Sequence, residues 1–133
     1  MIGIDRESSS PGLSPSCMRM ASVLGGGISG FGEVCGAVSG AVLSLGLIFG
    51  TNGNEEVEEF KSKRAKAREF VKKYMQDFAE SWGSVQCRHL VEMDEGRLPP
   101  AGSLRPVGTP KKLCDEYVDW SVKKVIEIRK TLG

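Results

Sequence analysis

The stretch NEEVEEFKSKRAKAREFVKKYMQDFAESW, residues 54–82, carries the strongest periodic pattern in the chain. Its apolar residues recur at intervals of three, four and seven, which is the repeat of one face of an α-helix. These residues are Val57, Phe60, Ala67, Val71, Tyr74, Phe78 and Trp82. Glutamates occupy the first turns, where the helix dipole favours negative charge. The stretch therefore predicts a long helix that buries one stripe.

A basic run from Lys61 to Arg68 follows those glutamates. Lysines and arginines four residues after glutamates on a helix form surface ion pairs. We interpret the run as a solvated face of the long helix rather than as a phosphate-binding patch.

Shorter helices are predicted on both sides of the long one. Proline in the first turn and threonine or serine just before it are typical helix starts. The expected helices run from Ser14-Pro15-Ser16 to about Leu24, from about Glu33 to Phe49, from a Ser84 cap through Cys87 to about Val91, and from Thr109-Pro110 to about Leu132. Gly25–Gly32 is expected to break regular structure, and residues 94–109 to form a surface loop.

Alternating strand patterns are weak throughout the sequence. The fold class predicted is therefore all-α, a single-domain bundle of four to five helices with a glycine-rich loop before the second. Residues 14–133 form this domain, and residues 1–13, which are polar and rich in serine, are expected to form a flexible arm.

Composition narrows the function classes. The chain has 133 residues with 40% hydrophobic and 26% charged content, as in one globular domain. A net charge of +1 and 7% aromatic residues give no field or stacking platform for nucleic acid. The uncharged run Val34–Phe49 is shorter than a membrane span and contains glycine and serine, so we expect a buried core helix and no membrane span. No signal peptide is visible, and we expect a cytoplasmic protein with reduced thiols.

Four cysteines, Cys17, Cys35, Cys87 and Cys114, are dispersed so that one falls on each short predicted helix. The absence of a CxxC pair excludes zinc-ribbon and thioredoxin motifs by spacing. Either the cysteines are small buried hydrophobic residues, or the bundle brings several sulfurs together. His89, two residues after Cys87 and so on another helix face, offers no site by itself.

Cys35 falls within the first turn of the helix predicted from Glu33. Free backbone amides and the dipole at a helix start favour an anion, and a thiolate is one. Cys35 is therefore the best candidate for a reactive thiol. Gly36 and Gly40 lie four apart on one face of this helix, which indicates close packing or a surface open to a cluster or substrate. The preceding glycines lack the Gly-Lys-Ser/Thr of a phosphate loop.

The segment Cys35-Gly36-Ala37-Val38-Ser39-Gly40 matches the CGAxxG signature of the C_GCAxxG_C_C family of redox-active proteins. The approach through Met20–Ser22, Gly25–Gly27 and Gly32–Val34 is similar to the family's, as are Gly83–Arg88 around Cys87 and the Tyr117-Val118 that follows Cys114. The chain resembles this family over roughly residues 17–130. The resemblance implies that Cys35, Cys87 and Cys114 act together and that Gly36, Ala37 and Gly40 serve packing. Cys17 lies nearer the glycine-rich loop than the family's first cysteine, so a three-sulfur set is better supported than a four-sulfur one.

The resulting hypothesis is a redox-active protein with clustered cysteines and Cys35 as an activated thiolate. Its catalytic residues would be Cys35, Cys87 and Cys114; as a metal site, the same three with Cys17 would ligate an iron–sulfur cluster or zinc. A redox partner protein, a small thiol or a metal is the expected partner, and the oligomeric state, including a homo-oligomer, stays open. The alternative is a non-catalytic helical interaction module with structural cysteines, so whether the protein is an enzyme is not decided by sequence.

Overall fold

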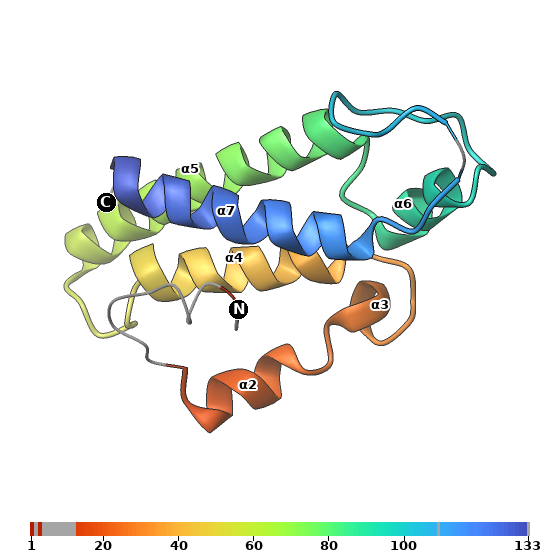
Figure 1. Ribbon diagram of the computed structural model, residues 1–133. Helices are drawn as coiled ribbons and strands as arrows, with labels where there is room; N and C mark the ends of the chain where they lie inside the picture. Colours follow the sequence, from red (N-terminus) through yellow and green to blue (C-terminus); the bar gives the residue numbers. More distant parts are fainter. Residues whose placement is uncertain (2, 4–12, 109, 133) are drawn as a thin grey trace.

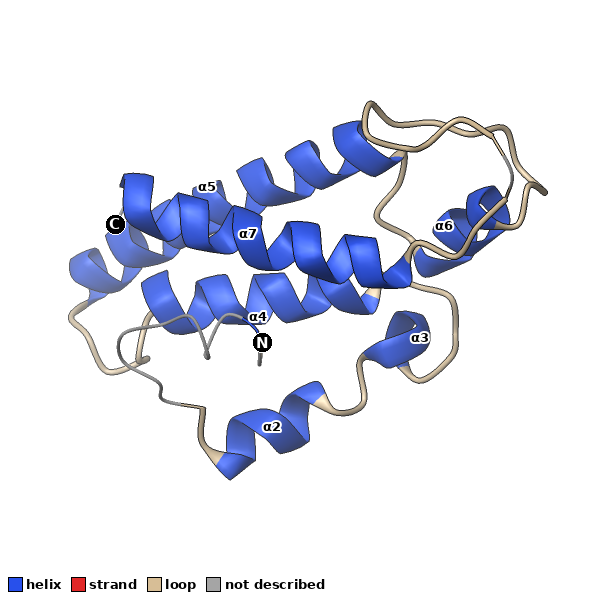
Figure 2. Cartoon of the chain, viewed as in Figure 1, coloured by secondary structure: helices blue, strands red, loops and turns tan. Residues whose placement is uncertain are grey.

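The computed structural model describes residues 1, 3, 13–108 and 110–132, and this part of the chain contains six α-helices and no strand (Figures 1 and 2). The helices are α2 (Pro15–Ala21), α3 (Gly25–Ile28), α4 (Gly36–Phe49), α5 (Val57–Trp82), α6 (Cys87–Asp94) and α7 (Cys114–Leu132). The all-α prediction is confirmed, with six helices rather than four to five. The predicted arm 1–13 lies mostly outside the described residues.

Three long helices form the body of the molecule. Helix α4 packs against both α5 and α7, which also contact each other, and Figure 1 shows the three helices side by side. Its buried face carries Val38, Ala41 and Leu45. No helix in the described ranges is long and apolar enough to cross a membrane.

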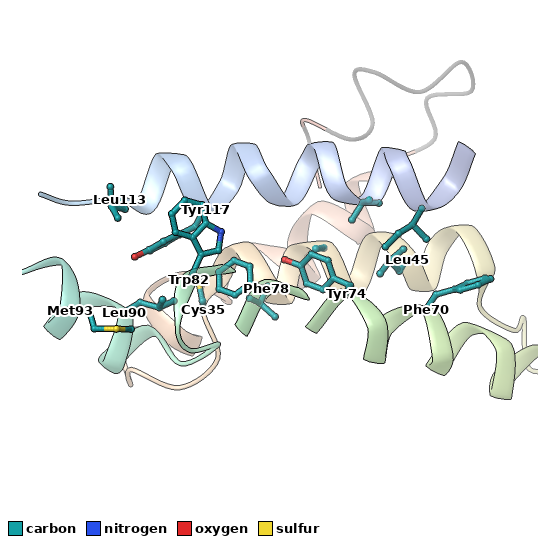
Figure 3. Packing of buried hydrophobic residues seen from close by; sticks show 14 residues of the cluster. Cys35, Leu45, Phe70, Tyr74, Phe78, Trp82, Leu90, Met93, Leu113 and Tyr117 are labelled. Atoms are coloured by element: carbon teal, nitrogen blue, oxygen red, sulfur yellow. The ribbon is translucent and has the colours of Figure 1, made fainter. Parts of the chain in front are cut away.

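The core runs along the second half of α5, from Phe70 to Trp82, as Figure 3 shows. The buried side chains of α5 are Phe70, Tyr74, Phe78 and Trp82, each four residues after the last. Phe70, which the periodic pattern left out, packs against Phe49 with ring centroids 4.5 Å apart. The other end of the core is closed by Trp82 against Tyr117 at 5.1 Å. Val57, predicted to belong to the stripe, is the first residue of α5 and is 65% exposed.

The glycine-rich segment contains the short helix α3, which the sequence did not predict, but its dihedral angles are not those of a regular α-helix. Gly26 and Gly27 have φ of +67° and +70°, and Ile28 and Ser29 continue at +67° and +51°. Four consecutive residues are thus left-handed, a conformation that costs side-chain-bearing residues about 1–2 kcal/mol each. The turn is closed by the amide of Glu33, which donates to Gly27 O at 3.0 Å.

Two helix starts differ from the sequence prediction because tertiary contacts hold the residues before them. α4 begins at Gly36 rather than near Glu33, since Val34 pairs with Gln86 in an isolated antiparallel bridge. α7 begins at Cys114 rather than at Pro110, and the predicted cap Thr109 lies outside the described residues.

The start of α6 also differs. Its N-cap is Gln86 rather than Ser84, and the hydroxyl of Ser84 instead accepts from the Gln86 amide at 3.0 Å. α6 extends to Asp94, beyond the predicted end at Val91.

Candidate functional site

A short antiparallel bridge holds Cys35 and Cys87 side by side. The amide of Cys35 donates to Val85 O at 2.8 Å, and the amide of Cys87 donates to Glu33 O at 2.6 Å, on either side of the Val34–Gln86 pair. Side chains alternate along extended segments, so Cys35 and Cys87 are diagonal neighbours on one face of the bridge. Both α4 and α6 begin at this point, which is how residues far apart in sequence come together.

The third cysteine, Cys114, is the first residue of α7 and reaches the same end of the bundle along α6. Pro110 lies against Gly96, since a Cβ at Gly96 would be 3.0 Å from the ring of Pro110. Further on, the amide of Leu113 donates to Asp94 Oδ2 at 3.1 Å. Pro110 contacts Gly96 and Leu113 contacts Asp94, so residues 110–113 run antiparallel to α6. This direction leads the chain toward the start of α6, where Cys87 lies.

The three cysteines differ in exposure, and all four cysteines of the chain are free thiols. Cys35 is buried at 9% exposure, Cys87 is half-buried and Cys114 is exposed. In Figure 3, Cys35 lies at one end of the core, near Trp82 and Leu90. The exposure of the three cysteines therefore decreases from Cys114 through Cys87 to Cys35.

The predicted activation of Cys35 is wrong for this form of the protein. Burial raises the pKa of the Cys35 thiol above its ordinary value, and this outweighs the lowering by the Ala37 and Val38 amides. The thiols of Cys87 and Cys114 raise it further. Cys35 is the N-cap of α4 rather than a first-turn residue.

The exposed thiol of Cys114 also has a raised pKa, which disfavours its thiolate form. Partial burial raises the pKa of Cys114, and the carboxylate of Asp94 raises it again, while Lys112 opposes this. Cys87 adds to the same effect, so the charges of the three sulfurs act on one another.

Alkylation should reveal the raised pKa of Cys35 directly. In a variant that keeps Cys35 alone, with the other cysteines changed to serine, the rate of iodoacetamide reaction should rise with a midpoint above about 8.5, the pKa of a free thiol. The folded form then binds the proton more tightly, so stability should fall as pH rises from the unfolded thiol's pKa through the folded one. The same chain in denaturant is the control. A midpoint below that of the denatured chain would contradict the burial argument.

Cys17 is placed apart from the other three. It lies in α2, where the hydroxyl of Ser14 donates to its sulfur at 3.3 Å. It lines an apolar groove with Val42, Leu43 and Leu47 of α4, beyond the helix start that holds Cys35. The structure thus places Cys35, Cys87 and Cys114 at the starts of α4, α6 and α7, and Cys17 apart from them in α2.

Metal-ligating side chains are not preassembled in the described part of the chain. No three His, Cys, Asp or Glu side chains there are placed to hold one metal ion. His89 is exposed and its Nδ1 lies 3.4 Å from the hydroxyl of Ser84.

Small residues allow the segments of the site to approach closely. A Cβ at Gly36 would be 3.4 Å from Gly25 Cα, so α3 meets α4 there. A Cβ at Gly27 would be 2.8 Å from the Cβ of Cys87. Gly40 lies near the amino group of Met1, and Ala37 packs against the core.

An ionic cluster that the sequence did not reveal fixes the end of α6 to the start of α7. The guanidinium of Arg105 donates from Nη1 to Asp94 Oδ1 at 2.7 Å, and the two side chains are 4% and 1% exposed. Its other nitrogens donate to Trp82 O at 2.8 Å, Tyr117 Oη at 2.9 Å and Ala101 O at 3.0 Å. The Tyr117 hydroxyl also donates to Asp94. The only sequence signal was an arginine followed by a proline in a loop predicted to be exposed.

The fold is a helical bundle with a cysteine at each of the starts of α4, α6 and α7, and comparison with known families shows which family it belongs to. The family model described as "Putative redox-active protein (C_GCAxxG_C_C)" matches residues 5–128, so the chain belongs to this family. No curated protein and no solved structure shows significant similarity to the chain.

Proposed function

We propose that this protein carries electrons by thiol–disulfide exchange at Cys35, Cys87 and Cys114. The observation that supports this most is that Cys35, Cys87 and Cys114 stand at the starts of α4, α6 and α7. Figure 1 shows these helix starts at one end of the bundle. Membership of a family described as redox-active points the same way.

The exposure of the three sulfurs suits this chemistry. A thiolate of the protein attacks a disulfide, one sulfur of which leaves as a thiolate; a second protein thiolate then displaces the other. The protein loses two electrons and two protons as its disulfide forms. An exposed or half-buried thiol can meet the incoming disulfide, and the buried Cys35 can close the protein's own.

A second candidate is an iron–sulfur or zinc site on the same sulfurs. Diagonal neighbours across an antiparallel bridge are about 7–8 Å apart at Cα, beyond the upper limit of about 6.8 Å for a disulfide. A bound ion or cluster spans that gap, and ligation removes the thiol protons. Cys35, Cys87 and Cys114 would hold the group and a fourth ligand would come from elsewhere, since Cys17 lies apart.

Anaerobic purification followed by metal analysis, visible absorbance and thiol titration tests both candidates. For exchange, we expect metal-free protein that loses two thiols on oxidation with a disulfide and regains them on reduction. Cys17→Ser should keep this response, and a variant with Cys35, Cys87 and Cys114 all changed to serine should lose it. Stoichiometric iron or zinc would instead favour the second candidate, and inert thiols in metal-free protein would contradict both.

A further inference from the structure

We propose that Cys87 is the central sulfur of the site, pairing with Cys35 in one disulfide and with Cys114 in another, and that Arg105 positions the second pair. This rests on the proposed exchange function and assigns an order to its sulfurs. Two separate sets of contacts position the partners of Cys87. The antiparallel bridge positions Cys35, and the ionic cluster of Asp94 and Arg105 positions Cys114.

The first set of contacts is the bridge between Val34 and Gln86. Its two hydrogen bonds begin at the amides of Cys35 and Cys87 themselves, so the backbones of both cysteines are fixed relative to each other. A shift of about 1 Å would bring diagonal neighbours from about 7–8 Å into disulfide range. Gly27 approaches Cys87 closely, since a Cβ at Gly27 would lie 2.8 Å from the Cβ of Cys87.

The second set of contacts is the ionic cluster. Asp94 accepts from the Leu113 amide, directly before Cys114, and from Arg105 and Tyr117. Arg105 in turn connects Asp94 to the end of α5 through Trp82 O and to the loop after α6 through Ala101 O. The cluster therefore fixes the segment that runs back along α6 from Pro110, and with it the approach of Cys114 to Cys87. Helices α4 and α7 also pack against each other, but among the described residues no hydrogen bond links the start of α4 at Cys35 to the start of α7 at Cys114.

The gradient of exposure gives the order of steps. The Cys114 thiolate attacks a low-molecular-weight disulfide, forming a mixed disulfide and releasing one small thiolate. The Cys87 thiolate attacks the Cys114 sulfur and releases the second small thiolate. The Cys35 thiolate then attacks Cys87, which leaves a buried Cys35–Cys87 disulfide and a free Cys114 thiolate. Two electrons pass to the small disulfide, and each step exchanges one S–S bond for another.

Serine variants equilibrated in glutathione redox buffer test the pairing. Cys35→Ser should still form Cys87–Cys114, Cys114→Ser should still form Cys35–Cys87, and Cys87→Ser should form no intramolecular disulfide. Peptide mapping identifies each bond, and Cys17→Ser in every background removes the remote thiol. A Cys35–Cys114 bond in Cys87→Ser at the wild-type yield would overturn the central role of Cys87.

Arg105→Lys tests the positioning role, because lysine keeps the charge but cannot reproduce the forked set of bonds. In the Cys35→Ser background we expect the equilibrium constant for the Cys87–Cys114 disulfide to fall by about ten- to hundredfold, the effect of small misplacement on intramolecular reactions. In the Cys114→Ser background, Arg105→Lys should change the equilibrium constant for the Cys35–Cys87 disulfide by no more than about twofold. A general loss of folding would lower this constant as well. Arg97→Lys, at an exposed pair with Glu95, should change neither.

Equal losses of both disulfides, or none, in Arg105→Lys would overturn the positioning role. If wild-type protein forms no reversible disulfide at all, the exchange function itself fails. If the wild-type protein exchanges disulfides but the variants pair their cysteines differently from the expectation, the exchange function stands. Only the roles given to Cys87 and Arg105 then fail.

Discussion

Replacing Arg105 with methionine is expected to lower the free energy of unfolding by about 3–5 kcal/mol, because it leaves the buried carboxylate of Asp94 without its cation. The side chain of Asp94 is 1% exposed, so water cannot take the place of the guanidinium. The carbonyls of Trp82 and Ala101 and the Tyr117 hydroxyl also lose a donor. Urea unfolding followed by circular dichroism measures the change.

Arg97→Met is the matched control. Arg97 pairs with Glu95, but both side chains are about half exposed, so this pair should contribute about 0–1 kcal/mol. Asp94→Leu combined with Arg105→Met should lose less than the sum of the two single changes, because no charge is left buried alone. Equal effects of Arg97→Met and Arg105→Met would contradict the cluster's structural role.

Gly27→Ala is expected to destabilise the protein by about 2–5 kcal/mol. About 1–2 kcal/mol comes from the left-handed conformation, since φ is +70°. A further amount of about 1–3 kcal/mol comes from overpacking, because the new methyl would be 2.5 Å from the amide nitrogen of Glu33 and 2.8 Å from the Cβ of Cys87. Neither neighbour is a flexible side-chain end that can move aside.

Gly26→Ala separates the two contributions. Gly26 has nearly the same φ, +67°, but a Cβ there has no atom within 4 Å. It should therefore lose only about 1–2 kcal/mol. If the two alanine variants lose equal stability by the same unfolding measurement, the close approach of the turn to Cys87 is wrong.

Periodicity was sufficient to predict the body of the fold. The end of α5 at Trp82 and the end of α4 at Phe49 agree with the structure, since side-chain repeats and glycine stops are local signals. The starts of α4 and α7 were predicted too early, because Val34 is held by Gln86 and Leu113 by Asp94. Such long-range contacts leave no mark on a local pattern.

The sequence predicted which cysteines belong to the candidate site, but not their protonation or the residues around them. Spacing alone left Cys35, Cys87 and Cys114 as dispersed residues, and the family resemblance grouped them. Whether Cys35 is a thiolate depends on burial, which only the packed core determines, and burial reversed the expected direction of its pKa. Arg105 was missed because its four acceptors are contributed by separate segments.

The packing of α4 against both α5 and α7 has a consequence for biosynthesis. Helix α7 is made after the others, and contacts between segments distant in the chain form late in folding. During translation, the face of α4 that packs against α7 therefore stays uncovered until α7 has been made. The sulfur of Cys35 remains accessible to reagents until then. Protection of Cys35 from a water-soluble maleimide, followed on ribosome-bound chains of increasing length, should thus mark the moment when the nascent protein closes its interior.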